Sequence, residues 1–373
     1  RRYLKMLYDR ATTEADRPKY FLYMGDCLWD NRMLTTEGQQ LNADDYLLCY
    51  ESENSFNEVT CYVDDSWVGL LDEGEGANPV TEQIDVAVGR FPVTTVAQAK
   101  VMVDKTIAYA NNAEAGNWQN TLVFMGDDGN ENLHMRDEDE VANYISELYP
   151  GYVAKKVMWD VYTRQSSSTG NSYPEVATLL KQQQAEGVLI MDYAGHGSEV
   201  QISHEAVLRL SDFASFTGKR WPLWITASCD IMPFDGTTAT IGETAVLNER
   251  GGTMAFYGTT RTVYANLNKY MNRAFLRRVL SFDTSGKPTT LGEAHRLAQN
   301  DLVKGMWIDA QHYEADRSSN RLQYALLGDP ALALHLPRPI VVVDSIGGRS
   351  LNNSSDTVKL SAGSVVRVRG HLQ

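Results

Sequence analysis

Short, continuously apolar runs alternate with amphipathic helical patterns along most of this chain, and this alternation constrains its fold more than any other feature. Continuously apolar runs are typical of parallel strands that are buried on both faces of a sheet. The order of the elements predicts an α/β fold in which helices cover both faces of a parallel sheet. The predicted strands lie within 19–26, 83–93, 118–129, 152–160, 188–200, 221–234 and 253–258, and the predicted helices at 94–112, 138–149, 173–187, 242–252, 268–282 and 290–304.

The pattern restarts near residue 115 and changes in character after residue 336. The restart predicts two α/β subdomains, 1–115 and 116–336, each with its own parallel sheet. Residues 337–373 alternate around Gly, Ser and Asn turns without a helix, which predicts the start of a truncated all-β, immunoglobulin-like sandwich. The first residues, RRYLKMLYDR, contain no initiator Met and no signal peptide, so we expect the chain to be a piece of a longer protein.

Acidic residues outnumber basic ones, with 48 Asp and Glu against 34 Lys and Arg and a formal net charge of −14. The basic residues are scattered, whereas a nucleic-acid-binding protein needs a concentrated cationic face, so we expect no nucleic-acid partner. No stretch approaches the roughly 20 apolar residues that a membrane-spanning helix needs. We therefore expect a globular protein without a transmembrane segment.

Two of the predicted strands end in a reactive side chain, His196 in VLIMDYAGHGSEV and Cys229 in WPLWITASCDIMPF. The carboxyl ends of parallel strands open into the crevice where ligands bind, so neighbouring strands would bring these two side chains face to face. Cys229 would be the nucleophile of an acyl transfer, and His196 would accept its proton and return it to the leaving amine. Each residue taken alone is more often structural, but their matched placement favours a catalytic dyad.

Small residues surround both members of the predicted dyad. Gly195 and Gly197 permit unusual backbone conformations and the close approach of a substrate chain. The N–H groups of Gly197 and Cys229 would form an oxyanion hole for the tetrahedral intermediate. The sequence thus predicts both the reacting pair and the donors that stabilise its intermediate.

The chain contains four cysteines, Cys27, Cys49, Cys61 and Cys229, and no histidine lies at a metal-ligand spacing from any of them. A zinc site is therefore not expected, and such sparse usage is not typical of a disulfide scaffold. Two alternatives remain for the three cysteines other than Cys229: one disulfide pair, or buried apolar residues, which we favour. The chemistry predicted for Cys229 requires no cofactor.

The segments YAGHGS (193–198) and ASCD (227–230) resemble the caspase-like cysteine peptidases, and within these the gingipain family. Further segments resemble the PorU-like sortases of the type IX secretion system of Bacteroidetes. These are VAVGRFPVTT (86–95), VFMGDDG (123–129), GETAVLNERGGTMAFYGTTRTVY (242–264), LLGDPAL (326–332) and DTVKL (356–360). The resemblance extends from about residue 19 to the end of the chain.

The resemblance implies a caspase-like fold and a secreted enzyme at the bacterial outer-membrane surface. The enzyme would cleave C-terminal targeting domains from exported cargo through a thioester on Cys229, and would pass the cargo to a surface lipopolysaccharide. Its partners would be these cargo domains and other secretion-system proteins of the outer membrane. Two alternatives are a gingipain-type secreted endopeptidase and a catalytically silent scaffold that docks the secretion machinery.

The resemblance also implies further site residues. In gingipain relatives an acidic residue after an earlier strand assists the histidine, and the matching GDDG favours Asp128 over Asp127, with a turn role for both as the alternative. Thr260, Arg261 and Tyr264 follow the strand at 253–258 and are expected to border the crevice and contact substrate, with a structural Arg as the alternative.

Calcium is a further alternative for the acidic runs DDGNENLHMRDEDE and YVDDSWVGLLDEGEG. The resemblance implies irregular calcium sites, so a structural Ca²⁺ is weighed against solvated loops. Neither run fits an EF-hand, because the position that needs Gly, counted from Asp128, is Leu133. His204 follows in a loop after His196, where we predict a surface residue.

Overall fold

The structure is a computed structural model that describes residues 1–53, 57, 61–168, 170–305, 314–337, 341–351 and 357–372. The chain divides into two compact units, Arg1–His335 and Leu336–Gln373, which are described separately below. No helix among the described residues has both the length and the apolar character needed to cross a membrane.

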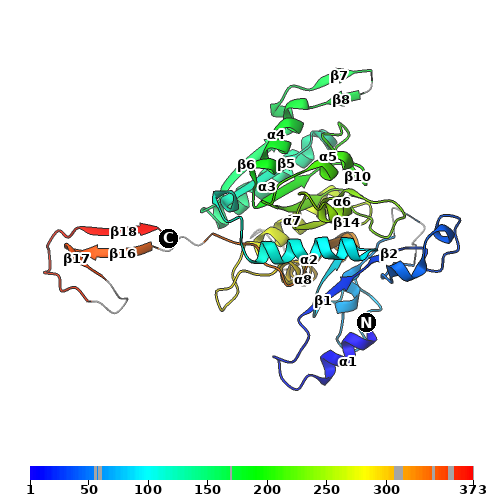
Figure 1. Ribbon diagram of the computed structural model, residues 1–373, viewed down its shortest axis with the longest axis horizontal. Coiled ribbons are helices and arrows are strands. Elements are labelled where there is room, and N and C mark those ends of the chain that lie inside the picture. The colour runs from blue at the N-terminus through cyan, green and yellow to red at the C-terminus, as the bar shows by residue number, and fades with distance from the viewer. Residues whose placement is uncertain are drawn as a thin grey trace. The chain divides into compact units, whose positions relative to one another are not determined.

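An eight-stranded sheet runs through the described part of the first unit (Figure 1). Its strands pair in parallel except for one antiparallel pair, β14 with β15. The order across the sheet is β1 (Tyr20–Met24), β4 (Ala87–Phe91), β15 (Tyr324–Leu327), β14 (Ala255–Thr259), β13 (Leu223–Ala227), β9 (Ile190–Ala194), β5 (Thr121–Gly126) and β6 (Val153–Met158). This is the mostly parallel α/β sheet that the alternation of strands and helices predicts.

The prediction of two separate sheets, one in 1–115 and one in 116–336, is wrong. β15 is antiparallel to β14 and parallel to β4, and it thereby joins the two halves into one sheet. The strand pattern does restart after β4, but the strand that continues the sheet from β4 comes from the far end of the unit. Sequential order along the chain therefore conceals this adjacency.

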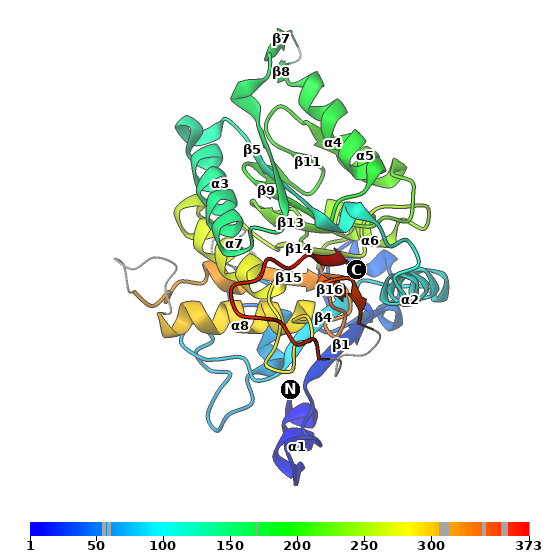
Figure 2. The same cartoon turned by 90° about the vertical axis from the view of Figure 1, so that its left-hand side faces the viewer.

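Helices cover both faces of the sheet, as Figure 2 shows. One face carries α3 (Gly129–Leu148), α7 (Ala265–Val279) and α8 (Leu291–Lys304); the other carries α2 (Val96–Ala110), α4 (Pro174–Glu186), α5 (Leu210–Ser215) and α6 (Ile241–Leu247). Smaller elements of this unit are α1 (Arg2–Arg10), β2 (Asp26–Cys27), β3 (Tyr46–Leu47), β7 (Gln165–Ser167), β8 (Gly170–Ser172), β10 (Gly197–Ser198), β11 (Gln201–Ile202) and β12 (Leu208–Arg209).

Helix termini are set by local chemistry that the sequence carries. Thr95 and Gln98 form a capping box at the start of α2, and Thr240 and Glu243 form another at the start of α6. Gly305 ends α8 in the left-handed conformation, with φ 78°. The caps satisfy backbone groups that a helix end leaves without partners.

The second unit contains a small antiparallel sheet among its described residues. β16 (Val341–Ile346) pairs with β17 (Arg349–Ser350) on one side and with β18 (Val368–Leu372) on the other. The predicted β segment includes residues 338–340, 352–356 and 373, which lie outside the described residues. An immunoglobulin-like sandwich remains a prediction.

A buried ion pair lies where β4 meets β15. Arg90 on β4 is fully buried, and its guanidinium donates to both carboxylate oxygens of Asp65, each over 2.7 Å. A third donor reaches the carbonyl oxygen of Gly25 over 2.6 Å. Arg90 also stands in register with Leu327 of β15, so this pair lies where the two halves of the sheet meet.

We predict that Asp65→Ala lowers the free energy of unfolding by about 3–5 kcal/mol, because it leaves a buried guanidinium without its charge partner. The double variant Asp65→Ala/Arg90→Met should recover much of this loss, since no buried charge then remains. Urea denaturation measures both values. The exposed pair Lys100–Asp104 supplies the control, since Asp104→Ala should cost at most about 1 kcal/mol. Equal losses for the two Asp variants would contradict the prediction.

Candidate active site

The ends of three adjacent strands place the candidate residues at one edge of the sheet. β9 lies between β13 and β5, and Ala194 is in register with Ala227 on one side and Gly126 on the other. The chain leaves these strands through Gly195–His196, Ser228–Cys229 and Asp127. The expectation that the His196 and Cys229 strands are neighbours is confirmed, and the candidate dyad lies at one edge of the sheet.

The Cys229 thiol is held by the main chain of Val263. Its Sγ donates to the Val263 carbonyl oxygen over 3.3 Å and accepts from the Val263 N–H over 3.4 Å. Burial raises the pKa of the thiol above its usual 9.0; the backbone contact with Val263 opposes this, and the charge of Asp230 adds to it. The thiol is therefore protonated at neutral pH.

The His196 ring lies between two other histidines. It stacks on His204 with ring centres 4.1 Å apart and meets the edge of His134 at 4.8 Å. Burial lowers the pKa of His196 below its usual 6.5; the charge of Asp127 opposes this, and the two neighbouring histidines reinforce it. The imidazole is therefore neutral at pH 7 and can accept a proton.

The described residues contain no hydrogen bond between Cys229 Sγ and the His196 ring. The two pKa directions indicate that the thiol and the imidazole are both neutral in the free protein. Catalytic hydrogen bonds are often long in a free enzyme and shorten when substrate binds. His204, predicted as a surface residue, is exposed and also forms one wall of the imidazole site.

Asp127 is the carboxylate that touches the histidine. It is buried, and its Oδ2 accepts from the His196 backbone N–H over 2.7 Å and from the Tyr193 hydroxyl over 3.1 Å. Its Oδ1 lies 2.5 Å from His134 Nδ1. Burial alone would raise the pKa of Asp127, but its contacts with His134 and His196 outweigh burial and hold the pKa below 3.8. Asp127 is thus a fixed negative charge beside the imidazole.

Asp128, which the sequence favours as the third residue, points elsewhere. Its Oδ2 accepts from the Tyr173 hydroxyl over 2.7 Å, and the Arg164 guanidinium lies 3.6 Å away. The geometry is therefore against the preference for Asp128 over Asp127. His134 is not among the site residues that the sequence predicts, although it lies in the run DDGNENLHMRDEDE. The available signal was a histidine seven residues after Asp127.

Gly195 and Gly197 are required because a side chain at either position would clash with its neighbours, and not because of an unusual φ. A Cβ on Gly195 would lie 2.1 Å from the Tyr193 hydroxyl oxygen, and one on Gly197 would lie 2.4 Å from Ser228 Oγ. Neither glycine is in the left-handed region. A larger residue at 195 would displace Tyr193 or Asp127, and one at 197 would push the histidine loop away from Ser228, the neighbour of Cys229. The oxyanion role of the Gly197 and Cys229 N–H groups stays a prediction.

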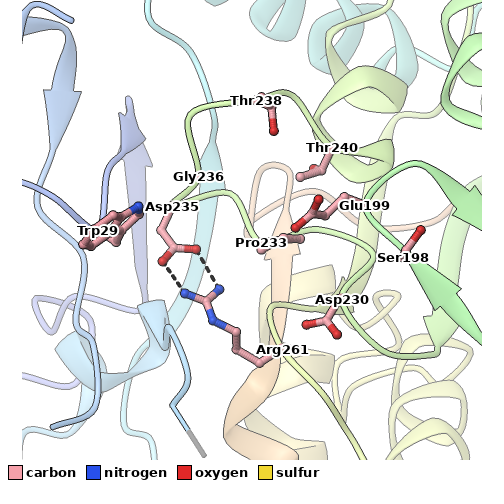
Figure 3. A pocket seen from close by; sticks show the side chains of 10 residues that line it. All are labelled: Trp29, Ser198, Glu199, Asp230, Pro233, Asp235, Gly236, Thr238, Thr240 and Arg261. Atoms are coloured by element: carbon pink, nitrogen blue, oxygen red, sulfur yellow. Dashed lines mark hydrogen bonds and ion pairs between the residues drawn. The ribbon is translucent and has the colours of Figure 1, made fainter. Parts of the chain in front are cut away.

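A pocket of about 460 Å³ is lined by residues that follow each member of the dyad in the chain. Figure 3 shows the side chains that line it. Ser198 and Glu199 line one side, directly after the His196 loop, and Asp230 follows Cys229. On the opposite side Arg261 donates to both carboxylate oxygens of Asp235, over 2.8 and 2.5 Å. Arg261 is the only cation among the described residues that line the pocket, and Asp235 neutralises it; Glu199 and Asp230 add negative charge to the lining.

The three predicted substrate-contact residues have different positions. Arg261 lines the pocket, but its guanidinium is held by Asp235, which favours the structural alternative. Thr260 is buried, and its hydroxyl donates to main-chain carbonyls such as that of Val63. Tyr264 is exposed at the start of α7. Of the three, only Arg261 lines this pocket.

One group of carboxylates in the described residues could hold a cation, and two of its three members, Asp72 and Glu75, belong to the run YVDDSWVGLLDEGEG. Oxygens of Asp72, Glu75 and Asp85 lie within 4.8 Å of one another. No second feature of these residues points to an ion, and the group is remote in sequence from the dyad. The four cysteines, all among the described residues, are free thiols, with Cys27 and Cys61 buried.

Comparison with known proteins agrees with this geometry. The family model of peptidase family C25 matches residues 1–335. The Arg-specific cysteine proteinase gingipain R (RGPB) has a TM-score of 0.65 at 15% identity, covering 92% of this chain and 70% of its own. The complex of the pro- and mature domains of Porphyromonas gingivalis RgpB has a TM-score of 0.60 at 15% identity, covering 92% and 71%.

Dimeric latent PorU from Porphyromonas gingivalis has a TM-score of 0.44 at 22% identity, covering 93% of this chain and 26% of its own. A comparison with curated proteins finds no match. The family match spans the whole of the first structural unit, and that unit carries both the sheet and the dyad. We conclude that this chain is a member of peptidase family C25, a gingipain-like cysteine peptidase with a caspase-like α/β fold.

Proposed function

We propose that Cys229 and His196 cleave peptide bonds through a thioester. The observation that carries this proposal is their position, one residue beyond Gly195 and Ser228 at the ends of paired parallel strands. The neutral imidazole takes the proton from Sγ as the thiolate attacks the substrate carbonyl. The imidazolium then protonates the leaving amine, and the acyl group stays on Cys229 until a second nucleophile removes it.

Because burial keeps both the thiol and the imidazole neutral, the proton transfer from Cys229 to His196 creates a thiolate and an imidazolium. The N–H groups of Gly197 and Cys229 are the donors we assign to the oxyanion. Asp127 holds the main chain of His196, and its negative charge favours the imidazolium that forms. His134 hydrogen-bonds to Asp127 and packs against the His196 ring, so it helps to position both residues.

We further propose that the substrates are C-terminal targeting domains of proteins exported by the type IX secretion system. The segments 86–95, 123–129, 242–264 and 326–332, which resemble PorU-like sortases, support this. In this role the enzyme lies at the outer-membrane surface with other secretion-system proteins, and an acceptor on a surface lipopolysaccharide resolves the thioester. The dyad chemistry requires no cofactor, and a Ca²⁺ at Asp72, Glu75 and Asp85 would be structural.

The test compares purified cargo proteins with and without their C-terminal domains, using mass spectrometry to locate the cut. We expect cleavage at the domain junction by the wild type, and loss by about 10²-fold or more in His196→Ala. Cys229→Ser should be inactive, while Cys49→Ser, the same change at another half-buried thiol, should retain activity. Cleavage of proteins irrespective of that domain would favour the gingipain-type endopeptidase. Equal activity of both Cys variants would overturn the role of Cys229.

The pH profile should reflect a neutral pair. Activity needs His196 unprotonated, and burial lowers its pKa, so the acid limb of kcat/KM should lie below pH 6.5. Activity is lost when the pair has lost its shared proton, and burial raises the pKa of Cys229, so the alkaline limb should lie above pH 9. Iodoacetamide labelling of Cys229 in the free protein should likewise keep rising beyond pH 9. Labelling that levels off below pH 7 would show an ion pair instead.

The two adjacent aspartates give a matched pair of variants. Asp127→Asn removes the charge that faces His196, and kcat should fall by roughly 10-fold or more, since general acid–base groups contribute about 10²–10⁴-fold. Asp128→Asn makes the same chemical change at a carboxylate bound to Tyr173, and kcat should stay within about 3-fold of the wild type. A larger loss of kcat in Asp128→Asn than in Asp127→Asn would show that Asp128 is the acidic residue that assists His196.

A further inference from the structure

A second hollow is lined by the strand ends next to the dyad and by residues of α3 and α7. These two helices lie on the same face of the sheet (Figure 2). It is lined by Ala194 and Ala227, the last residues of β9 and β13, and by Ala265 at the start of α7. Each of the two strand residues stands two positions before a member of the dyad. The hollow has a volume of about 10 Å³, which is room for about one water molecule.

An ion-pair cluster between α7 and α3 borders this hollow. Lys269 on α7 places its Nζ 2.8 Å from Asp137 Oδ1 and 2.8 Å from Glu140 Oε2, both on α3. Lys269 and Asp137 also line the hollow. Burial would lower the pKa of Lys269, but these two carboxylates outweigh it and raise the pKa. The acidic group that a basic substrate side chain would seek is therefore already occupied by a lysine of the protein itself.

The floor of the hollow is polar and incompletely paired. The Asn272 amide donates to both carboxylate oxygens of Asp192, over 3.1 and 3.0 Å, and to Glu138 Oε2 over 3.3 Å. Glu138 and Asn272 are fully buried and line the hollow. Burial raises the pKa of Glu138 well above its usual 4.5, so this carboxyl is protonated and shares a hydrogen bond with Asp192. Among the described residues, Asn272 Oδ1 has no hydrogen-bond partner, and it is an acceptor that a small hydroxyl group could reach.

We propose that this hollow is a specificity subsite that accepts Gly, Ala or Ser at the scissile bond and that Lys269 closes it to basic side chains. The inference rests on the proposed dyad and names the substrate class on which that dyad acts. A longer side chain would have to displace the β9 and β13 main chain or the α7 helix. An Arg or Lys would in addition have to expel Lys269 from between Asp137 and Glu140.

The test is a cleavage profile of the 373-residue chain. A mixed peptide library is digested, and the cut sites are identified by mass spectrometry. Synthetic peptides based on a preferred site then carry Gly, Ala, Ser, Leu, Lys or Arg at the scissile bond. We expect kcat/KM for Leu, Lys and Arg to fall by roughly 10-fold or more, since each poorly fitted methylene is worth roughly 10–200-fold. Ser should be cleaved at least as well as Ala.

Lys269→Ala should open the hollow and leave Asp137 without its cation, so cleavage beside Lys or Arg should rise by about 10-fold relative to cleavage beside Ala. Lys156→Ala, which breaks an exposed lysine–carboxylate pair with Asp139, should keep the wild-type profile. Because the readout is a ratio between peptides, a general loss of stability does not mimic the change.

Efficient wild-type cleavage beside Leu, Lys or Arg would overturn the subsite and leave the proposed peptidase intact. A profile unchanged by Lys269→Ala would overturn the assignment of Lys269. Cleavage of no peptide, with Cys229 labelling unaffected by His196→Ala, would overturn the proposed function and this inference with it.

Discussion

The active-site edge depends on the register of three parallel strands. Ala194 stands level with both Gly126 and Ala227, so the chain leaves β5, β9 and β13 at the same height. A shift of one residue in any pair would turn every side chain to the opposite face of the sheet. Asp127, His196 and Cys229 come together because buried apolar strands fix this register, and no contact among the three could fix it alone.

The same burial that fixes the strands also sets the electrostatics of the dyad. It moves the pKa of the thiol upward and that of the imidazole downward, so both side chains are uncharged at neutral pH. Asp127 keeps its charge because it accepts hydrogen bonds from His196 and His134. Asp127 therefore stays charged beside His196, while the imidazole and the thiol carry no charge in the free protein.

The sequence predicts much of this arrangement, for reasons that can be named. His196 and Cys229 each end a continuous apolar run, and parallel strands bring such ends together. Asp127 and Asp128 could not be distinguished, because neighbouring residues of a turn point in different directions and the sequence does not say which faces the crevice. The single sheet could not be foreseen either, because the sequence does not say that β15, near the end of the first unit, pairs with β4.

Arg261 and His134 show a further limit of sequence interpretation. Arg261 follows a strand, as a substrate-binding residue would. Its partner Asp235 belongs to a different segment, so the ion pair is recognised only in the structure. His134 lies among acidic residues, so the composition of its surroundings suggested a metal. Partners distant in the chain decide the role of both residues.

The position of β15 has a consequence for the order in which the enzyme can be assembled. As long as Tyr324–Leu327 is absent, β4 and β14 both present unpaired edges, and the sheet is divided. The residues just before β15 also hold the segment beside the nucleophile: the Gln323 carbonyl accepts from the Thr260 N–H, and Asn320 accepts from the Tyr264 N–H. A chain that folds from its amino terminus therefore completes the surroundings of Cys229 last, so peptidase activity would appear only once the whole unit has emerged.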